Sequence, residues 1–213
     1  MTQGATAATR IRACLLDSGG ILFANVTEDT PFFAEIGRLY SVDGNLVRAA
    51  YEDRDAEFEC GACTATEVLI DALGLVGVPR RHVSVARLHD LYNECIVPYT
   101  EVFRVLEERP RRDGGLRVAL ANNEARDWEA IKHSRFGHLA LFDAVASSWA
   151  LGLIKPTAEY FQAALEVVRA SAAETVFIDD NELCIIAASD AGIPTVHYEG
   201  VEAFVAVLTG EST

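Results

Sequence analysis

The stretch VFIDDNELCIIAASDAGI, residues 176–193, joins a short apolar run to a pair of aspartates and then to an alanine-rich segment that closes on a glycine. A short apolar run bounded by polar residues is typical of a buried strand, and a longer alanine-rich segment favours a helix. The stretch therefore predicts a strand followed by a helix, with Asp179 and Asp180 at the carboxyl end of the strand.

Further short apolar runs, bounded by polar residues or glycine, extend this pattern along the chain. The predicted strands are Ile11–Asp17, Leu116–Asn122, Phe142–Ser147, Thr175–Asp179 and Pro194–Tyr198. Helical stripes of apolar residues alternate with them, for example in Thr157–Ala170 and in residues 201–208. Strands that alternate with helices predict an α/β fold with a parallel sheet, in which ligands bind beyond the carboxyl ends of the strands.

The chain from Asn25 to about Pro98 breaks this alternation, because it carries three helical stripes and no convincing strand. We predict a small all-helical domain of roughly 70 residues, at residues 25–98, inserted after the first strand. The α/β core then comprises residues 10–24 and 99–213, and it resumes with a helix near Tyr99–Glu108.

The composition and net charge of the chain argue against some classes of binding partner. The chain has 213 residues, 50% of them hydrophobic, and a formal net charge of −14, which disfavours nucleic acid and anionic membrane surfaces. No apolar stretch approaches the ~20 residues that span a bilayer, and residues 1–10 carry no signal pattern and indicate a frayed leader. We expect a cytoplasmic protein that binds a small molecule. Whether it is a monomer or a homodimer stays open.

Residues suited to ligand binding lie at or after the carboxyl ends of the predicted strands. These residues are Asp17, Ser18, Gly19, Gly20, Ala121, Asn122, Lys155, Asp179 and Asp180. Because the carboxyl ends of parallel strands share one edge of the sheet, three carboxylates and a lysine are expected to converge on a ligand. Carboxylate and backbone oxygens are the ligands that Mg²⁺ prefers. By contrast, Cys60 and Cys63 have zinc or redox spacing but no matching second pair.

The motifs LLDSGGILF (residues 15–23), LIKPTAEYF (153–161) and VFIDDNELCIIAASDAGI resemble, in this order, signature motifs of the haloacid dehalogenase superfamily. The resemblance covers about Ile11 to Tyr198. It implies a Rossmann-like parallel core, with the helical insert in the place of that family's helical cap. The motif DSGGIL is similar to that of a branch with sugar-1-phosphate phosphatases.

The resemblance implies the role of each site residue. Asp17 is the implied nucleophile, which attacks phosphorus to give an aspartyl-phosphate. Asp17, the backbone carbonyl of Gly19, Asp179 and Asp180 are the implied Mg²⁺ ligands, and Lys155 neutralises the nucleophile and binds phosphate. The implied phosphate-binding positions are Ser18, Gly20, Ala121, Asn122 and Lys155. The implied substrate contacts are Arg54, Phe58 and Arg126.

Two positions depart from the family's pattern. Gly19 stands where phosphatases of this kind usually carry a second aspartate, whose acid–base help is typically worth ~10²–10⁴-fold. Ala121 stands where a serine or threonine usually contacts phosphate. An anomeric or acyl phosphate has a better leaving group and depends less on a proton donor, so Gly19 favours a substrate such as a sugar 1-phosphate.

Three functional hypotheses follow. The leading one is a Mg²⁺-dependent phosphohydrolase of a small phosphorylated metabolite. The second is a 2-haloacid dehalogenase, in which Asp17 attacks carbon; Gly19 is compatible with it, but the Asp179–Asp180 pair argues against it. The third, motivated by Gly19 and Ala121 together, is a binding or regulatory protein without turnover. A phosphoacceptor receiver domain fits less well, because it lacks the long insert.

Overall fold

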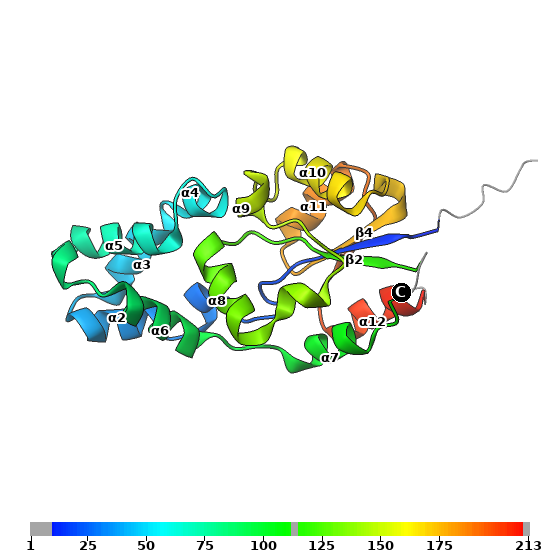
Figure 1. Cartoon of the computed structure of the whole chain (residues 1–213). Helices are drawn as coiled ribbons and strands as arrows, with labels where there is room; N and C mark the ends of the chain where they lie inside the picture. Colours follow the sequence, from blue (N-terminus) through cyan, green and yellow to red (C-terminus); the bar gives the residue numbers. More distant parts are fainter. Residues whose placement is uncertain (1–9, 112–114, 211–213) are drawn as a thin grey trace, which may run out of the picture.

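The computed structural model describes residues 10–111 and 115–210, and in these residues the strands form one five-stranded parallel sheet (Figure 1). The sheet order is β3-β2-β1-β4-β5. The strands are β1 (Ala13–Leu16), β2 (Arg117–Leu120), β3 (Ala144–Val145), β4 (Thr175–Asp179) and β5 (Thr195–His197). The predicted frayed leader falls almost wholly on residues 1–9, which lie outside the described residues.

Helices separate the strands in the chain. They are α1 (Val26–Asp29), α2 (Phe32–Tyr40), α3 (Gly44–Glu52), α4 (Asp55–Glu59), α5 (Ala65–Leu75), η1 (Arg80–His82), α6 (Val85–Cys95), α7 (Thr100–Glu108), α8 (Arg126–Phe136), η2 (His138–Leu141), α9 (Ser148–Leu151), α10 (Ala158–Val168), η3 (Ala172–Glu174), α11 (Glu182–Asp190) and α12 (Val201–Thr209). Among the described residues, no helix is both long enough and apolar enough to cross a membrane.

The predicted α/β fold with a parallel sheet is confirmed, because all five predicted strands are present and pair in parallel. Four of the strands are shorter than predicted, since the chain leaves the ladder near the polar residues that bound each apolar run. The helices predicted near Tyr99–Glu108, at Thr157–Ala170 and at residues 201–208 are also present, as α7, α10 and α12.

Both faces of the sheet are covered by helices. Successive side chains of a strand point to opposite faces, so a strand covered on both sides is apolar throughout. Leu15 and Phe177 share one core with Tyr160 of α10 and Ala188 of α11. Leu16 belongs to the other core, which includes residues of α7 and α12. Figure 1 accordingly shows α10 and α11 above the sheet, and α7 and α12 below it.

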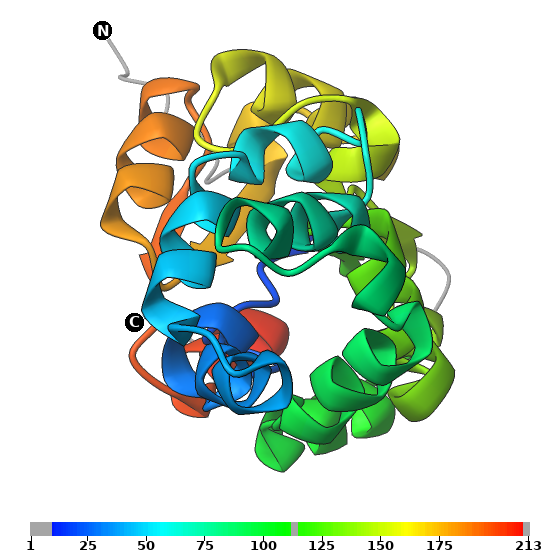
Figure 2. The same cartoon turned by 90° about the vertical axis from the view of Figure 1, so that its left-hand side faces the viewer.

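Helices α1 to α6 follow β1 and form the helical segment that the sequence predicts as an insert. The two connections at its base run side by side: the N–H of Ala24 donates to the carbonyl of Val97 at 3.0 Å, and the N–H of Tyr99 to that of Leu22 at 2.8 Å. Figure 2, viewed from the side of this segment, shows its helices in front of the strands. We propose that residues 25–98 form a cap domain on the α/β core.

Trp128, on α8, links the helical segment to the rest of the structure. Its ring stacks on Tyr92 of α6, with ring centroids 4.1 Å apart, and its indole N–H donates to the hydroxyl of Tyr51 on α3 at 2.9 Å. An aromatic pair of this kind stabilises the fold by about 0.5–1.5 kcal/mol beyond the contribution of the apolar area that it buries. Trp128 is therefore part of the core, and it holds two helices of the segment against α8.

The strand register sets the place of the site. Leu16 of β1 pairs with Leu120 of β2 and with Ile178 of β4. The residues that follow each of these positions therefore lie at one edge of the sheet, and Asp17 and Asp179 become neighbours although they lie far apart in the sequence.

Candidate active site

A buried lysine lies between two buried carboxylates at the carboxyl ends of β1 and β4. The Nζ atom of Lys155 donates to Oδ1 of Asp17 and to Oδ2 of Asp179, at 2.6 Å in each case. The three side chains are exposed by 4%, 10% and 1% respectively. A buried charge is costly unless it is paired, so Lys155 compensates both carboxylates.

Electrostatics leave this cluster charged near neutral pH. Burial raises the pKa of Asp17 to about 6; Lys155 opposes that shift and Asp179 adds to it. The ammonium of Lys155, 2.6 Å from Oδ1 of Asp17, favours the ionised form that a nucleophile needs. Burial by itself would lower the pKa of Lys155, but the carboxylates of Asp17 and Asp179 outweigh it and hold this pKa above its usual value.

Asp180 lies against the loop that follows β1. Gly20 has a φ of +65°, which favours glycine, and a Cβ atom there would lie 1.8 Å from Oδ2 of Asp180 and displace that carboxylate. The cap of α11 is Asn181, whose side chain accepts from two backbone N–H groups at the helix start. Asp180 is therefore not needed as a helix cap, and it lines the cleft above Asp17.

In the loop after β1, one N–H group that was expected to contact phosphate has a partner within the loop. The N–H of Gly20, predicted to contact phosphate, donates to the carbonyl of Phe23 at 2.9 Å and is already used within the loop. The hydroxyl of Ser18 is buried and has no hydrogen-bond partner among the described residues. A buried polar atom without a partner is uncommon and suits a site that receives a polar ligand.

The acidic residues fit a magnesium ion. Asp17, Asp179 and Asp180 each offer a carboxylate oxygen, and these oxygens lie within 4.8 Å of one another. Such hard oxygen donors are what Mg²⁺ prefers. Gly19, whose carbonyl is the other predicted ligand, lines the same cleft.

Gly19 leaves room for an amide from the helical segment. A Cβ atom at residue 19 would lie only 2.4 Å from Oδ1 of Asn25, the residue just before α1. The amide of Asn25 thus occupies the space into which a side chain at position 19 would extend. At position 19, where the family usually has an aspartate, the space left by glycine is therefore filled by the side chain of Asn25.

The end of β2 is organised by a buried glutamate. Ala121 is fully buried and offers no hydroxyl, and the amide nitrogen of Asn122 donates to Oε1 of Glu129 at 3.2 Å. Glu129 also accepts from the hydroxyl of Ser147 at 2.5 Å and from the indole N–H of Trp149 at 2.7 Å. This network holds Asn122 in place beside the cluster.

Asn123 fixes the backbone of the lysine. Its Nδ2 donates to the carbonyl of Lys155 at 3.0 Å, and its Oδ1 accepts from the N–H of Lys155 at 2.8 Å. Two hydrogen bonds from one side chain to one residue restrict both position and orientation, so Asn123 positions the lysine that bridges the two carboxylates.

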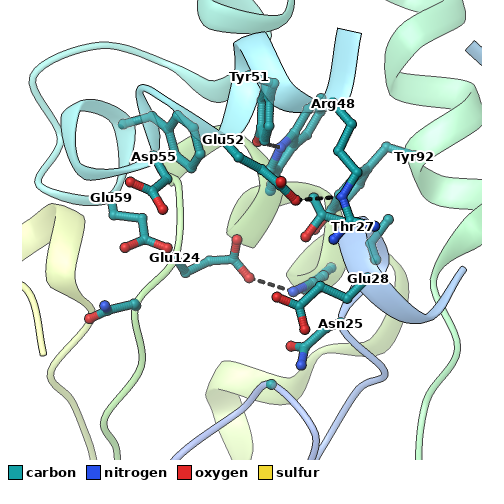
Figure 3. A pocket seen from close by; sticks show the side chains of 16 residues that line it. Asn25, Thr27, Glu28, Arg48, Tyr51, Glu52, Asp55, Glu59, Tyr92 and Glu124 are labelled. Atoms are coloured by element: carbon teal, nitrogen blue, oxygen red, sulfur yellow. Dashed lines mark hydrogen bonds and ion pairs between the residues drawn. The ribbon is translucent and has the colours of Figure 1, made fainter. Parts of the chain in front are cut away.

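A cleft of about 500 Å³ opens over Asp17 and Lys155, and it adjoins a cavity of about 360 Å³ beside the helical segment (Figure 3). The two share part of their lining. The shared residues are Gly19, Asn25, Thr27, Glu28, Asp55, Glu59 and Asn123. A ligand bound at Asp17 can therefore extend into the cavity beneath α3 and α4.

The predicted substrate contacts divide into two groups. Phe58 is buried and lines the cavity. Arg54 pairs with Glu57 at 2.7 Å and with Asp71 at 3.0 Å, and it lines neither the cleft nor the cavity. Arg126, the first residue of α8, is exposed and likewise lines neither. The structure thus brings Phe58 to the site and directs Arg54 to other partners.

Comparison with known proteins places this geometry in a family. A family model described as haloacid dehalogenase-like hydrolase matches residues 80–198, just over half of the chain, including Lys155 and the Asp179–Asp180 pair. The chain belongs to the haloacid dehalogenase-like hydrolases. The resemblance seen in the three motifs is thereby confirmed at the level of the family, and the protein is a hydrolase of that family.

Individual relatives share about a quarter of the aligned residues with this chain. The chain is 25% identical to the sesquiterpene phosphatase astK of Aspergillus oryzae over 191 residues, which cover 89% of this chain and 90% of that protein. It is 27% identical over 110 residues to the pyrophosphatase PpaX of Bacillus mycoides, covering 51% of this chain and 49% of that protein.

Solved structures share the fold. A haloacid dehalogenase family enzyme of Bacteroides thetaiotaomicron, in complex with magnesium and inorganic phosphate, superposes with a TM-score of 0.68 at 23% identity, over 89% of this chain and 94% of that one. The L-2-haloacid dehalogenase of Xanthobacter autotrophicus, with chloropropionic acid covalently bound, gives 0.63 at 22% identity, over 95% and 84%.

Several residues of the site are absent from the sequence-based prediction. Asn25, Asn123 and Glu59 line the cleft, and the first and last of them come from the chain between β1 and α7. Asn123 follows the predicted strand end directly, so its place in the chain could have indicated it. Asn25 and Glu59 carry no comparable signal, because their position depends on how the helical segment packs.

Proposed function

We propose that this haloacid dehalogenase-like hydrolase is a Mg²⁺-dependent phosphohydrolase of a small phosphorylated metabolite. The observation that carries the proposal is the cluster of Asp17, Lys155 and Asp179, with Asp180 beside it. It combines a carboxylate nucleophile, a cation for phosphate and oxygen ligands for a metal in one buried site. The relatives astK, a sesquiterpene phosphatase, and PpaX, a pyrophosphatase, support the same class, as do the magnesium and phosphate bound by the structural neighbour.

The residues suggest a two-step reaction. A carboxylate oxygen of Asp17 attacks phosphorus while the bond to the leaving oxygen breaks, and water then attacks the aspartyl-phosphate to release phosphate. Lys155 and the hydroxyl of Ser18 hold the phosphate oxygens. A Mg²⁺ held by Asp17, Asp179, Asp180 and the carbonyl of Gly19 would reduce the repulsion between the nucleophile and the phosphate.

The cavity beside the cleft restricts the leaving group. The carboxylates of Glu28 and Asp55 line it, are exposed to solvent and form no ion pair with another described residue. Each repels a further negative charge, although water weakens this repulsion. The cavity therefore favours a leaving group that is neutral or cationic over one that carries a second phosphate.

The rates on substrates with good and poor leaving groups test whether Gly19 leaves the enzyme without a proton donor. If no other residue supplies a proton, sugar 1-phosphates should be hydrolysed faster than sugar 6-phosphates, since the anomeric oxygen is the better leaving group. A phosphate-release screen with Mg²⁺ that contrasts these two classes, together with monophosphates and bisphosphates, measures both preferences.

The nucleophile has a direct test. Asp17→Asn keeps the shape of the side chain and removes its negative charge, so phosphate release should fall to background, and EDTA should abolish the activity of the wild type until Mg²⁺ is restored. Asp190→Asn, an exposed aspartate at the end of α11, is the matched control and should retain full activity. Undiminished phosphate release by Asp17→Asn would overturn the proposal.

The other two hypotheses predict different results in the same assay. Halide release from 2-chloropropionate without Mg²⁺, and no phosphate release, would favour the dehalogenase. Absence of turnover on every substrate would favour a binding or regulatory role.

A further inference from the structure

The proposed reaction needs a proton for the leaving oxygen, and the residue that usually supplies it is missing. Gly19 has no side chain, and the neighbouring Asn25 amide fills its space but does not release a proton at neutral pH. Lys155 is tied to two carboxylates, and Asp180 belongs to the predicted metal site. A proton donor must therefore come from another residue that faces the same cleft.

Glu59 faces this cleft from the helical segment. It is the last residue of α4, and it lines both the cleft over Asp17 and the adjoining cavity, as Gly19 does. Figure 3 shows its carboxylate directed into the cavity, near those of Asp55 and Glu124. Glu59 is thus placed where a substrate on Asp17 passes from the phosphate site into the cavity.

The packing of α4 holds Glu59 in this position. The preceding residue, Phe58, is buried and stacks on Tyr51 with ring centroids 4.8 Å apart. Gly61, two residues after Glu59, has a φ of +78°, and a Cβ there would lie 2.5 Å from the carbonyl oxygen of Trp149. The end of α4 therefore rests directly on the backbone near α9, and Glu59 lies between two anchored residues.

The other carboxylates of the cavity are occupied or exposed. Glu124 pairs with Lys132, and Glu52 pairs with Arg48 at 2.6 Å. Glu28 and Asp55 are exposed to solvent. Glu59 is only partly exposed and forms no side-chain hydrogen bond or ion pair with another residue in the described ranges, so its oxygens are available to a substrate.

We propose that Glu59 is the general acid and base of the phosphohydrolase, in the role that a second aspartate would have at position 19. This inference rests on the proposed function. In the first step the carboxyl of Glu59 gives its proton to the leaving oxygen as the bond from that oxygen to phosphorus breaks and the bond from Asp17 forms. In the second step its carboxylate takes a proton from the attacking water, phosphate leaves Asp17, and Glu59 is protonated again.

The surroundings of Glu59 favour the protonated form that the first step needs. Burial, and the negative charges of Asp55 and Glu124, raise the pKa of Glu59 to about 8, while Lys155 opposes the shift and Asp17 adds to it. The carboxyl therefore holds its proton at pH 7 and loses it above about pH 8. With Glu59 as the acid, the wild type is not limited to substrates with good leaving groups.

The test compares two substrates of similar shape. Phenyl phosphate has a leaving oxygen that needs a proton, whereas p-nitrophenyl phosphate has one that leaves without it. Glu59→Gln should lower kcat/KM for phenyl phosphate by ~10²–10⁴-fold and for p-nitrophenyl phosphate by less than about tenfold. Glu57→Gln, on the same helix and paired with Arg54 outside the cleft, is the control and should lower neither.

The pH profile separates an acid from a merely structural residue. With phenyl phosphate, kcat/KM of the wild type should fall as pH rises above about 8, because Glu59 loses its proton, and this limb should be absent in Glu59→Gln. Asp55→Asn removes a neighbouring negative charge, so the limb should move to lower pH.

The outcomes distinguish the two proposals. Equal losses on both substrates, or no loss, would overturn the role of Glu59 while leaving the phosphohydrolase intact, provided that Asp17→Asn is inactive. Hydrolysis that survives Asp17→Asn, or the absence of Mg²⁺-dependent hydrolysis of both esters, would overturn the proposed function and the role of Glu59 with it.

Discussion

Replacement of Lys155 by methionine should destabilise the protein in a way that Mg²⁺ reverses. Methionine is unbranched and close in length, so it removes the charge with little change of shape. The lysine is exposed by 4% and contacts Asp17 and Asp179 at 2.6 Å, so its loss leaves two buried carboxylates facing each other. Breaking a buried ion pair by removing one partner costs ~3–5 kcal/mol, against a total stability of about 5–15 kcal/mol.

Urea unfolding followed by tryptophan fluorescence measures this loss. With a slope of ~2 kcal/mol per M, the midpoint should fall by roughly 1.5–2.5 M in the absence of metal. The carboxylates freed from the lysine are ligands for Mg²⁺, so the ion should stabilise Lys155→Met more than the wild type. A free concentration of about one hundred times the Kd adds ~2.7 kcal/mol.

Lys132→Met is the matched control for this experiment. Lys132 is also buried, exposed by 8%, and pairs with the partly buried Glu124, but no metal cluster of the described residues includes that glutamate. Its loss of stability should therefore be similar and insensitive to Mg²⁺. An unchanged midpoint for Lys155→Met without metal, or equal rescue of both variants by Mg²⁺, would refute the assignment of charge compensation and metal binding to one cluster.

Two further predictions concern residues that hold the site in place. Gly19→Asp would bring its Cβ to 2.4 Å from Oδ1 of Asn25, so the Asn25 side chain must turn aside before a carboxyl at position 19 can enter the cleft; combining it with Asn25→Gly should therefore give a higher kcat/KM for phenyl phosphate than Gly19→Asp alone, and equal values for the two would contradict this explanation. Asn123→Ala removes two hydrogen bonds to the backbone of Lys155, so urea unfolding should show a loss of about 1–3 kcal/mol and kcat should fall; wild-type values for both would show that Asn123 does not position the lysine.

Much of the fold could be predicted from local patterns. Each buried strand is a short apolar run that ends in polar residues, and β4 begins and ends where the sequence predicts. The cluster of Asp17, Lys155 and Asp179 could also be predicted, because parallel strands bring their carboxyl ends to one edge. No local pattern indicates that the N–H of Gly20 donates to the carbonyl of Phe23 within the loop.

The remaining site residues depend on packing between segments far apart in the chain. Arg54 and Phe58 lie four residues apart, yet Phe58 lines the cavity while Arg54 pairs with Glu57 and Asp71. Which of them faces the site depends on the orientation of α4, and that orientation results from contacts such as Gly61 against Trp149. No local periodicity encodes such contacts.

The parallel α/β fold, the helical segment after β1 and the acidic centre around Asp17 thus follow from the amino-acid sequence, because hydrophobic periodicity and strand-end chemistry are local properties. The place of Asn25 beside Gly19 and the entry of Glu59 into the cleft from α4 become visible in three dimensions alone. Burial, charge and access to the cleft at these positions arise from the packing of the helical segment against the sheet edge.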